Sequence, residues 1–144
     1  GAKTYTSRAT DLDGNGLTES VQGNEKDKPV RAWIGPGAGT FAKAVYYVIG
    51  SVPKGVAIGD VNGDGRLDLI TTNTAGNYPS GNYPGGNTIS VLMNVGQGTF
   101  AKPLTFVTGT TPFAAALADF DGDGKLAVAT ANWTSSDVTV LMKI

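Results

Sequence analysis

A nine-residue loop occurs three times in the chain, and this internal repeat constrains the fold more than any other feature. The copies are DLDGNGLTE at 11–19, DVNGDGRLD at 60–68 and DFDGDGKLA at 119–127. A second shared element, GTFAK, stands at 39–43 and 98–102. Phe41 precedes Asp60 by 19 residues, and Phe100 precedes Asp119 by the same 19 residues. Both elements therefore belong to one repeating unit of about 49 residues.

Each unit contains short stretches rich in β-branched and aromatic residues, separated by turn-forming residues. Copy one contains TSRATD, TESVQG, VRAWIG and KAVYYVIG, and copy two contains GVAIGD, LDLITTN, TISVLMN and PLTFVTG. Copy three contains AAALAD, LAVATAN and DVTVLMK. The 21 glycines and 7 prolines supply many turns, so we predict an all-β fold with up to four strands in each unit.

Four strands in about 49 residues are typical of a β-propeller blade. We predict a single domain over 1–144, a β-propeller-type array of about three four-stranded antiparallel blades, the last lacking its fourth strand. The blades are expected at about 1–50, 51–109 and 110–144. A ten-residue insertion within 74–88 of copy two, with tandem GNYP units, is expected to form a surface loop. A β-solenoid is the structural alternative.

Charge and composition exclude several classes of function. The net charge is −1 and the basic residues are scattered, so nucleic acid is not an expected partner. No apolar run approaches the roughly 20 residues that span a bilayer, so membrane insertion is not expected either. The chain has no His and no Cys, which removes the usual general base and most transition-metal sites and leaves oxygen ligands.

The three loops carry oxygen-bearing side chains at positions 1, 3, 5 and 9, and a backbone carbonyl at position 7 completes a pattern suited to Ca²⁺. Nine of the 12 acidic residues lie at these positions, and their mutual repulsion favours a bound cation. We therefore predict two to three Ca²⁺ ions. The candidate ligands are Asp11, Asp13, Asn15, the Leu17 carbonyl and Glu19; Asp60, Asn62, Asp64, the Arg66 carbonyl and Asp68; and Asp119, Asp121, Asp123 and the Lys125 carbonyl.

The third loop has Ala127 at position 9, so it is expected to bind calcium most weakly. Asp-Gly and Asn-Gly also form hairpin turns without any metal, and this reading is the main alternative for a single copy. An EF-hand or dockerin loop starts in the same way but requires an acidic residue at position 12. Position 12 is Gln22, Thr71 and Thr130 here, which disfavours both.

The segment GVAIGDVNGDGRLDLITTN, followed by NTISVLMNVGQGTF, closely resembles the FG-GAP/VCBS repeat family of integrin-α-type propeller blades. The resemblance extends over nearly the whole chain and implies calcium-binding loops at the positions named above. It also implies a secreted or cell-surface protein that serves in adhesion or glycan recognition. Copy one departs from the pattern, with GPGAGTF and a polar NEKDKP stretch.

Three classes of function follow. The first is an extracellular calcium-binding adhesion or recognition module, and the second is a structural subunit of a calcium-dependent homo-oligomer or filament. The third is the non-catalytic part of a polysaccharide-degrading enzyme, since no catalytic residues are evident and the chain itself is not expected to be an enzyme.

A glycan ligand would contact Tyr78 and Tyr83 in the insertion, whereas Trp33 and Trp133 are expected to pack between blades. A protein ligand, a second copy or the remainder of a longer propeller chain are the other expected partners, because open blade faces need covering.

Overall fold

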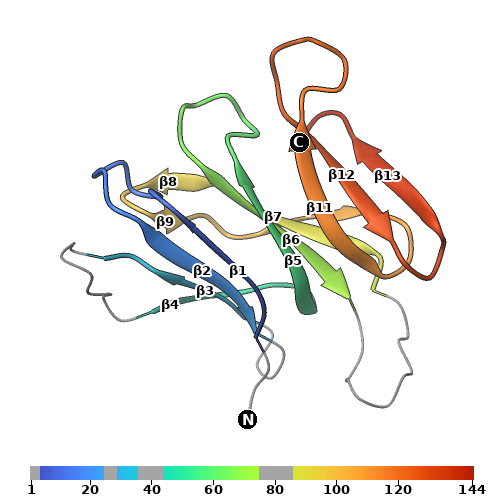
Figure 1. Cartoon of the computed structure of the whole chain (residues 1–144), viewed down its shortest axis with the longest axis horizontal. Helices are drawn as coiled ribbons and strands as arrows, with labels where there is room; N and C mark the ends of the chain where they lie inside the picture. The colour runs from blue at the N-terminus through green and yellow to red at the C-terminus, as the bar shows by residue number, and fades with distance from the viewer. Residues whose placement is uncertain (1–3, 25–28, 36–43, 75–85) are drawn as a thin grey trace.

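The computed structural model describes residues 4–24, 29–35, 44–74 and 86–144. Within these ranges the chain forms thirteen β-strands and no helix. The strands make three main antiparallel sheets, which lie side by side in chain order as an open row (Figure 1). The predicted all-β array of antiparallel blades is therefore confirmed, and the described strands do not close into a ring.

The three sheets correspond to the three sequence copies and are called blades one to three. Blade one contains β1 (Thr4–Thr10), β2 (Glu19–Asn24), β3 (Pro29–Trp33) and β4 (Val45–Val48), in that order. Blade two contains β5 (Val52–Gly59), β6 (Asp68–Thr74), β7 (Thr88–Leu92) and β10 (Leu104–Val107), with the hairpin β8 (Asn94–Gly96) and β9 (Thr99–Phe100) between β7 and β10. Blade three contains β11 (Pro112–Ala118), β12 (Ala127–Asn132) and β13 (Asp137–Leu141). As predicted, the described part of blade three has three strands.

The first two strands of each blade pair in the same register. Position 9 of the loop lies opposite the last residue of the first strand, as in Thr10 with Glu19 and Gly59 with Asp68. Blade three repeats this register with Ala118 opposite Ala127. Loop positions 1 to 8 thus connect the strands of a hairpin, and position 9 begins the second strand. The repeat spacing in the sequence therefore places all three acidic loops at the same end of their blades.

The core lies between the blades in two layers. The layer between blades one and two contains buried Leu12, Val21, Val30, Ala32, Ile49, Val56, Leu69, Leu92 and Phe100. The layer between blades two and three contains Ala57, Val61, Ile70, Ile89, Val91 and Val128. Every residue of β6 is buried, because blade two has a neighbour on both sides. Each fully buried branched aliphatic side chain contributes about 1.5–3 kcal/mol, so these layers hold the loops in place.

The GTF element of copy two links two blades. Gly98 lies in the turn before β9, and the Phe100 ring packs edge-on against Tyr47 of β4, with ring centroids 5.4 Å apart. The Phe100 amide donates a hydrogen bond to the Tyr47 hydroxyl at 3.2 Å. The motif therefore anchors blade two's hairpin to the outer strand of blade one. The equivalent element of copy one, and the GNYP units of the insertion, lie outside the described residues.

Candidate metal centres in the three acidic loops

All three loops are built on the aspartate at position 1. In loop one the two carboxylate oxygens of Asp11 accept hydrogen bonds from the amides of Gly14 and Gly16, both at 2.8 Å. Asp60 holds Gly63 and Gly65 in the same way, at 2.7 and 2.8 Å. Asp119 holds the amides of loop three's two glycines at 2.7 and 2.9 Å. The loops therefore share one backbone conformation, which the first aspartate stabilises.

The glycines at positions 4 and 6 are required by the backbone. Their φ angles are +81° and +84° in Gly14 and Gly16, and the corresponding glycines of loops two and three have φ between +77° and +84°. L-residues with a Cβ disfavour this left-handed region, whereas glycine enters it without a steric cost. Each left-handed turn reverses the chain, so the side chains at positions 1, 3 and 5 stay close together. This explains the D-x-D/N-G-D/N-G pattern in physical terms.

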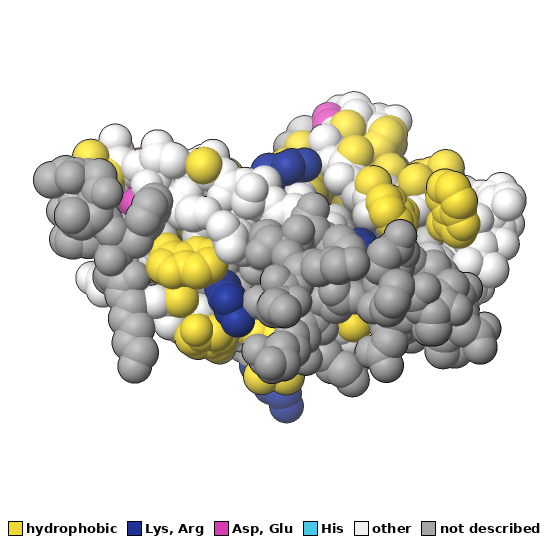
Figure 2. Space-filling view, turned by 60° about the horizontal axis from the view of Figure 1, so that its bottom comes forward, with side chains coloured by type: hydrophobic (Ala, Val, Ile, Leu, Met, Phe, Trp, Pro, Cys, Tyr) yellow, Lys and Arg dark blue, Asp and Glu magenta, His cyan; other side chains and the backbone are white. Residues whose placement is uncertain are grey.

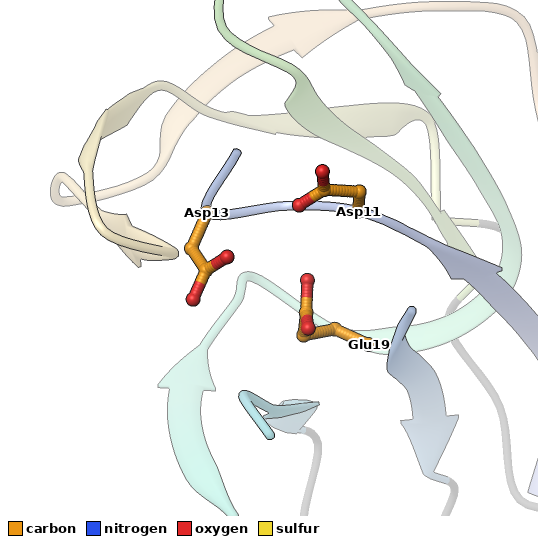
Figure 3. Close-up of side chains that lie close together, drawn as sticks. All are labelled: Asp11, Asp13 and Glu19. Carbon is orange, nitrogen blue, oxygen red and sulfur yellow. The ribbon is translucent and has the colours of Figure 1, made fainter. Parts of the chain in front are cut away.

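In loop one, three carboxyl groups converge. Oxygens of Asp11, Asp13 and Glu19 lie within 4.8 Å of one another, and Figure 3 shows the three side chains pointing toward a common space. Glu19 has no exposed surface. One of its oxygens, Oε2, accepts a hydrogen bond from the Leu12 amide at 2.7 Å. The other, Oε1, is buried and has no hydrogen-bond partner. Buried carboxylate oxygens are rarely left unpaired, so Glu19 Oε1 is a ready ligand for a cation.

Loop two arranges the equivalent residues differently. Asp68 at position 9 is fully buried, and its two oxygens accept hydrogen bonds from the amides of Val61 at 3.0 Å and Asn94 at 2.8 Å. Burial raises the pKa of Asp68, although both hydrogen bonds act in the opposite direction. The Arg66 guanidinium forms an ion pair with Asp64 at 2.6 Å. Among the described residues, three-carboxylate clusters occur in loops one and three, and loop two instead neutralises part of its charge through Arg66.

Loop three clusters the carboxylates of Asp119, Asp121 and Asp123 within 4.8 Å, and all three side chains are exposed. Hydrogen bonds from backbone amides, above all Gly124, lower the pKa of Asp119. Ala127 is buried at the position that Glu19 and Asp68 occupy in the other loops. Loop three therefore has no buried carboxylate at position 9, as the alignment of the three copies predicts.

Comparison with protein families identifies this arrangement. The FG-GAP-like repeat family matches residues 11–71 and 78–130, which is most of the chain. The FG-GAP repeat family matches residues 53–92.

The chain belongs to the FG-GAP repeat family.

The family resemblance inferred from the sequence is therefore confirmed. FG-GAP repeats are non-catalytic structural and adhesion modules, they are typical of extracellular or surface proteins, and they often bind calcium. Among curated proteins, no match to the chain was found. In the described part of this FG-GAP chain, no helix is long and apolar enough to cross a membrane.

Asn94 is a site residue that the sequence analysis missed. Its side chain donates hydrogen bonds to the carbonyl oxygens of Leu12 at 2.9 Å and Leu67 at 3.1 Å, and so bridges loops one and two. The Arg66 Nε group donates to the Asn94 carbonyl at 2.8 Å. A cavity of about 140 Å³ lies beside this bridge, lined by residues of both loops. No repeat signal marks Asn94, because the equivalent positions in the other two copies carry Gly35 and Lys143.

The predicted aromatic contacts have mixed outcomes. Tyr78 and Tyr83, the predicted glycan contacts, lie outside the described residues. Trp33 pairs with Ser20 on the face of blade one that points away from blade two. Trp133 is 75% exposed and lies against Phe113, with ring centroids 6.3 Å apart. Neither tryptophan packs between two of the described blades, so that expectation was wrong.

Proposed function

We propose that this FG-GAP chain is a calcium-stabilised extracellular recognition module, in which Ca²⁺ ions hold the hairpin loops in one conformation. Loop one supports the proposal most strongly, because Glu19 Oε1 is buried without a partner beside two further carboxylates. Two carboxylates about 5 Å apart repel each other by roughly 3 kcal/mol at an effective dielectric of about 20. A divalent cation converts this repulsion into attraction, which accounts for a buried acid in that place.

Loop one fits a hard cation with oxygen ligands. The protein would supply Asp11, Asp13, Asn15 and Glu19 through their side chains and Leu17 through its carbonyl. Ca²⁺ accepts 6–8 oxygens, so water completes the coordination shell. Loop two would use Asp60, Asn62 and Asp68 with the Arg66 carbonyl, after Asp64 exchanges its Arg66 partner for the ion. Loop three would use its three exposed aspartates and the Lys125 carbonyl, and we expect it to be the weakest site.

The ions would act on stability and on the shape of the loop surface rather than on a reaction. With a Kd near 10⁻⁴ M and about millimolar calcium, each site adds about 1–2 kcal/mol to the free energy of unfolding. Differential scanning fluorimetry tests this directly. We expect the melting temperature to rise by several degrees in CaCl₂ relative to EGTA and by less in MgCl₂, which demands tighter octahedral geometry. Identical melting curves in CaCl₂ and EGTA would contradict the proposal.

The proposed ligand of the module is a glycan or a protein. Tyr78 and Tyr83 remain the candidates for sugar contact, because they carry aromatic faces in an insertion between strands. A glycan array with the unmodified chain and with Tyr83→Ala checks this part. We expect calcium-dependent binding that the substitution weakens at least tenfold. Equal binding by both proteins would place the sugar elsewhere on the chain.

A structural role in an assembly is the second candidate. It is favoured by one observation, the large exposed aliphatic surface on blade three, where Val138 is 66% and Val140 43% exposed. Such surfaces on soluble domains commonly mark contact sites.

A further inference from the structure

Blade two shows what the two faces of a blade do in this protein. Its front face, which points toward the preceding blade, carries Ile58, Leu69 and Leu92 in paired positions and packs against blade one. Its back face, which points toward the following blade, carries Ala57, Ile70 and Val91 and packs against blade three. Side chains alternate between the faces along each strand. Front and back denote the equivalent faces of every blade.

Blade three is aliphatic on both faces. Its front face packs against blade two with Ala115, Leu117, Val128 and Leu141. Its back face carries Ala114, Ala116, Ala129, Ala131, Val138 and Val140. No charged residue stands among these six, and a sheet that is apolar on both faces is typical of one buried on both faces. Among the described residues, however, nothing covers the back face.

The back-face positions of β12 and β13 are buried where they recur in blades one and two. Val138 corresponds to Val30 of blade one and Ile89 of blade two, which have no exposed surface, whereas Val138 is 66% exposed. Val140 corresponds to Ala32 and Val91, which are also fully buried. Blades one and two each bury these positions against the front face of the following blade. The back face of blade three has the same positions but no such neighbour among the described residues.

The exposed face continues into an aromatic groove. Phe113 is 52% and Trp133 75% exposed, and together with Ala114, Ala131, Asn132 and Asp137 they line a groove of about 300 Å³. Hydrophobic side chains gather at this end of the molecule in Figure 2, where Figure 1 places β11 to β13. The surface therefore combines a flat aliphatic sheet with a recess that accepts a protruding side chain.

The front face of blade one carries Trp33 where blade two has Leu92, but it lacks branched aliphatic residues at three other positions. Ser7 and Ser20 stand where blade two has Val56 and Leu69, and Ala9 stands where it has Ile58. Gln22 and Arg31 are paired on the same face, and the Arg31 guanidinium lies over the Tyr46 ring, 5.2 Å from its centroid. Burying these groups against an aliphatic sheet would remove polar groups from water without new hydrogen bonds. The two ends of the row are therefore not complementary to each other.

We propose that the back face of blade three is a docking surface for the front face of another blade of this repeat type. The occupant carries branched aliphatic side chains at the positions of Val56, Ile58 and Leu69. Continuity with the two internal interfaces supports this occupant, because it extends the same packing by one step. Blade one of a second copy does not meet the requirement, so the unmodified chain does not associate head to tail.

Grafting the required face onto blade one tests the proposal in the full chain. The variant Ser7→Val/Ala9→Ile/Ser20→Leu gives blade one the residues of blade two at three front-face positions, and the introduced valine and isoleucine suit β-strands. Sedimentation velocity in calcium-containing buffer should show a monomeric unmodified chain and a variant that associates head to tail as its concentration rises. Adding Val138→Lys/Val140→Lys to the variant should restore the monomer. Val95→Lys, at a 59% exposed site on β8, lies on neither of the two faces; it is the matched control and should leave association intact.

A mixing experiment separates the two faces. The grafted chain that also carries Val138→Lys/Val140→Lys presents only the new front face, so it should form a one-to-one complex with the unmodified chain. Circular dichroism checks the fold, and the single Ser20→Leu variant, expected to associate more weakly, replaces the triple variant if that does not fold. Failure of all grafted variants to associate would overturn the proposal. Association that persists after Val138→Lys/Val140→Lys would also overturn it. Dimerisation of the unmodified chain through Val138 and Val140 would overturn it too, because the occupant would then be blade three of a second copy.

Discussion

Replacing Glu19 with glutamine should stabilise the chain in the absence of calcium, and calcium should remove much of that gain. In the absence of the ion, Glu19 Oε1 is buried without a hydrogen-bond partner, which costs about 1–3 kcal/mol, and it faces two neighbouring carboxylates. A glutamine keeps an acceptor for the Leu12 amide and offers an N–H to Asp11 or Asp13. The Glu19→Gln variant should therefore be more stable than the unmodified chain by about 1–2 kcal/mol in EGTA.

Calcium should reduce this difference in stability. With a Kd near 10⁻⁴ M, about 1 mM calcium adds roughly 1.4 kcal/mol to the stability of the loop-one site. Loss of one carboxylate ligand that weakens binding about tenfold reduces this increment to roughly 0.4 kcal/mol. The calcium-dependent gain at loop one thus falls by about 1 kcal/mol, while the other two loops contribute equally to both proteins.

Urea denaturation followed by circular dichroism, in EGTA and in calcium, measures the stability difference without the ion and the gain in unfolding free energy that calcium adds. The decisive result is the calcium increment, which should be smaller for Glu19→Gln than for the unmodified chain. Asp137→Asn is the control, since Asp137 is acidic but lies outside the loops, and its increment should equal that of the unmodified chain. An equal increment in Glu19→Gln would show that Glu19 is not a calcium ligand, and a destabilised variant in EGTA would refute the argument from its unpaired oxygen.

Three further predictions address the third loop, pH and the core. Ala127→Asp should tighten calcium binding at loop three about tenfold in calorimetric titration. It should also lower stability in EGTA by about 1–3 kcal/mol, because the new carboxylate is buried. An unchanged calcium affinity would exclude a ligand role for position 9. Hydrogen bonds from Asn132 and Ser135 lower the pKa of Asp137, so the stability they provide is present above the unfolded pKa of about 3.9 and is lost as pH falls through the folded value. Urea midpoints of Asp137→Asn and the unmodified chain should therefore differ at pH 5 and converge near pH 2; a constant difference would contradict this. Leu69→Ala, at a fully buried site between blades one and two, should cost about 2–5 kcal/mol of unfolding free energy, whereas Val48→Ala should cost under about 0.5 kcal/mol.

The loops and blades could be derived from the sequence because they depend on local spacing. Position 9 follows position 1 by eight residues, and this distance alone sets the hairpin register of Thr10 with Glu19 and Gly59 with Asp68. Glycines at positions 4 and 6 are needed wherever the backbone turns with positive φ, and they stand in all three copies. Interactions between residues so close in the chain leave little for the rest of the molecule to decide.

The differences between the loops, by contrast, came from contacts over long sequence separations. The Asn94 amide reaches Asp68 across 26 residues and its side chain reaches Leu12 across 82, so loop two is satisfied by a residue that no repeat marks. The sequence analysis predicted a ligand role for the Arg66 carbonyl, but only the folded loop shows that the Arg66 guanidinium forms an ion pair with Asp64.

By itself, the sequence determined the repeat, the strand order within each blade and the position of every acidic loop, because hairpins form between neighbouring segments. Only the tertiary structure decided which blade faces are buried. Ala129 and Val140 have the same strand pattern as Ile70 and Val91, yet their exposure depends on whether another sheet lies against them. Burial is a property of how blades stack, and stacking depends on surfaces that lie tens of residues apart in the chain.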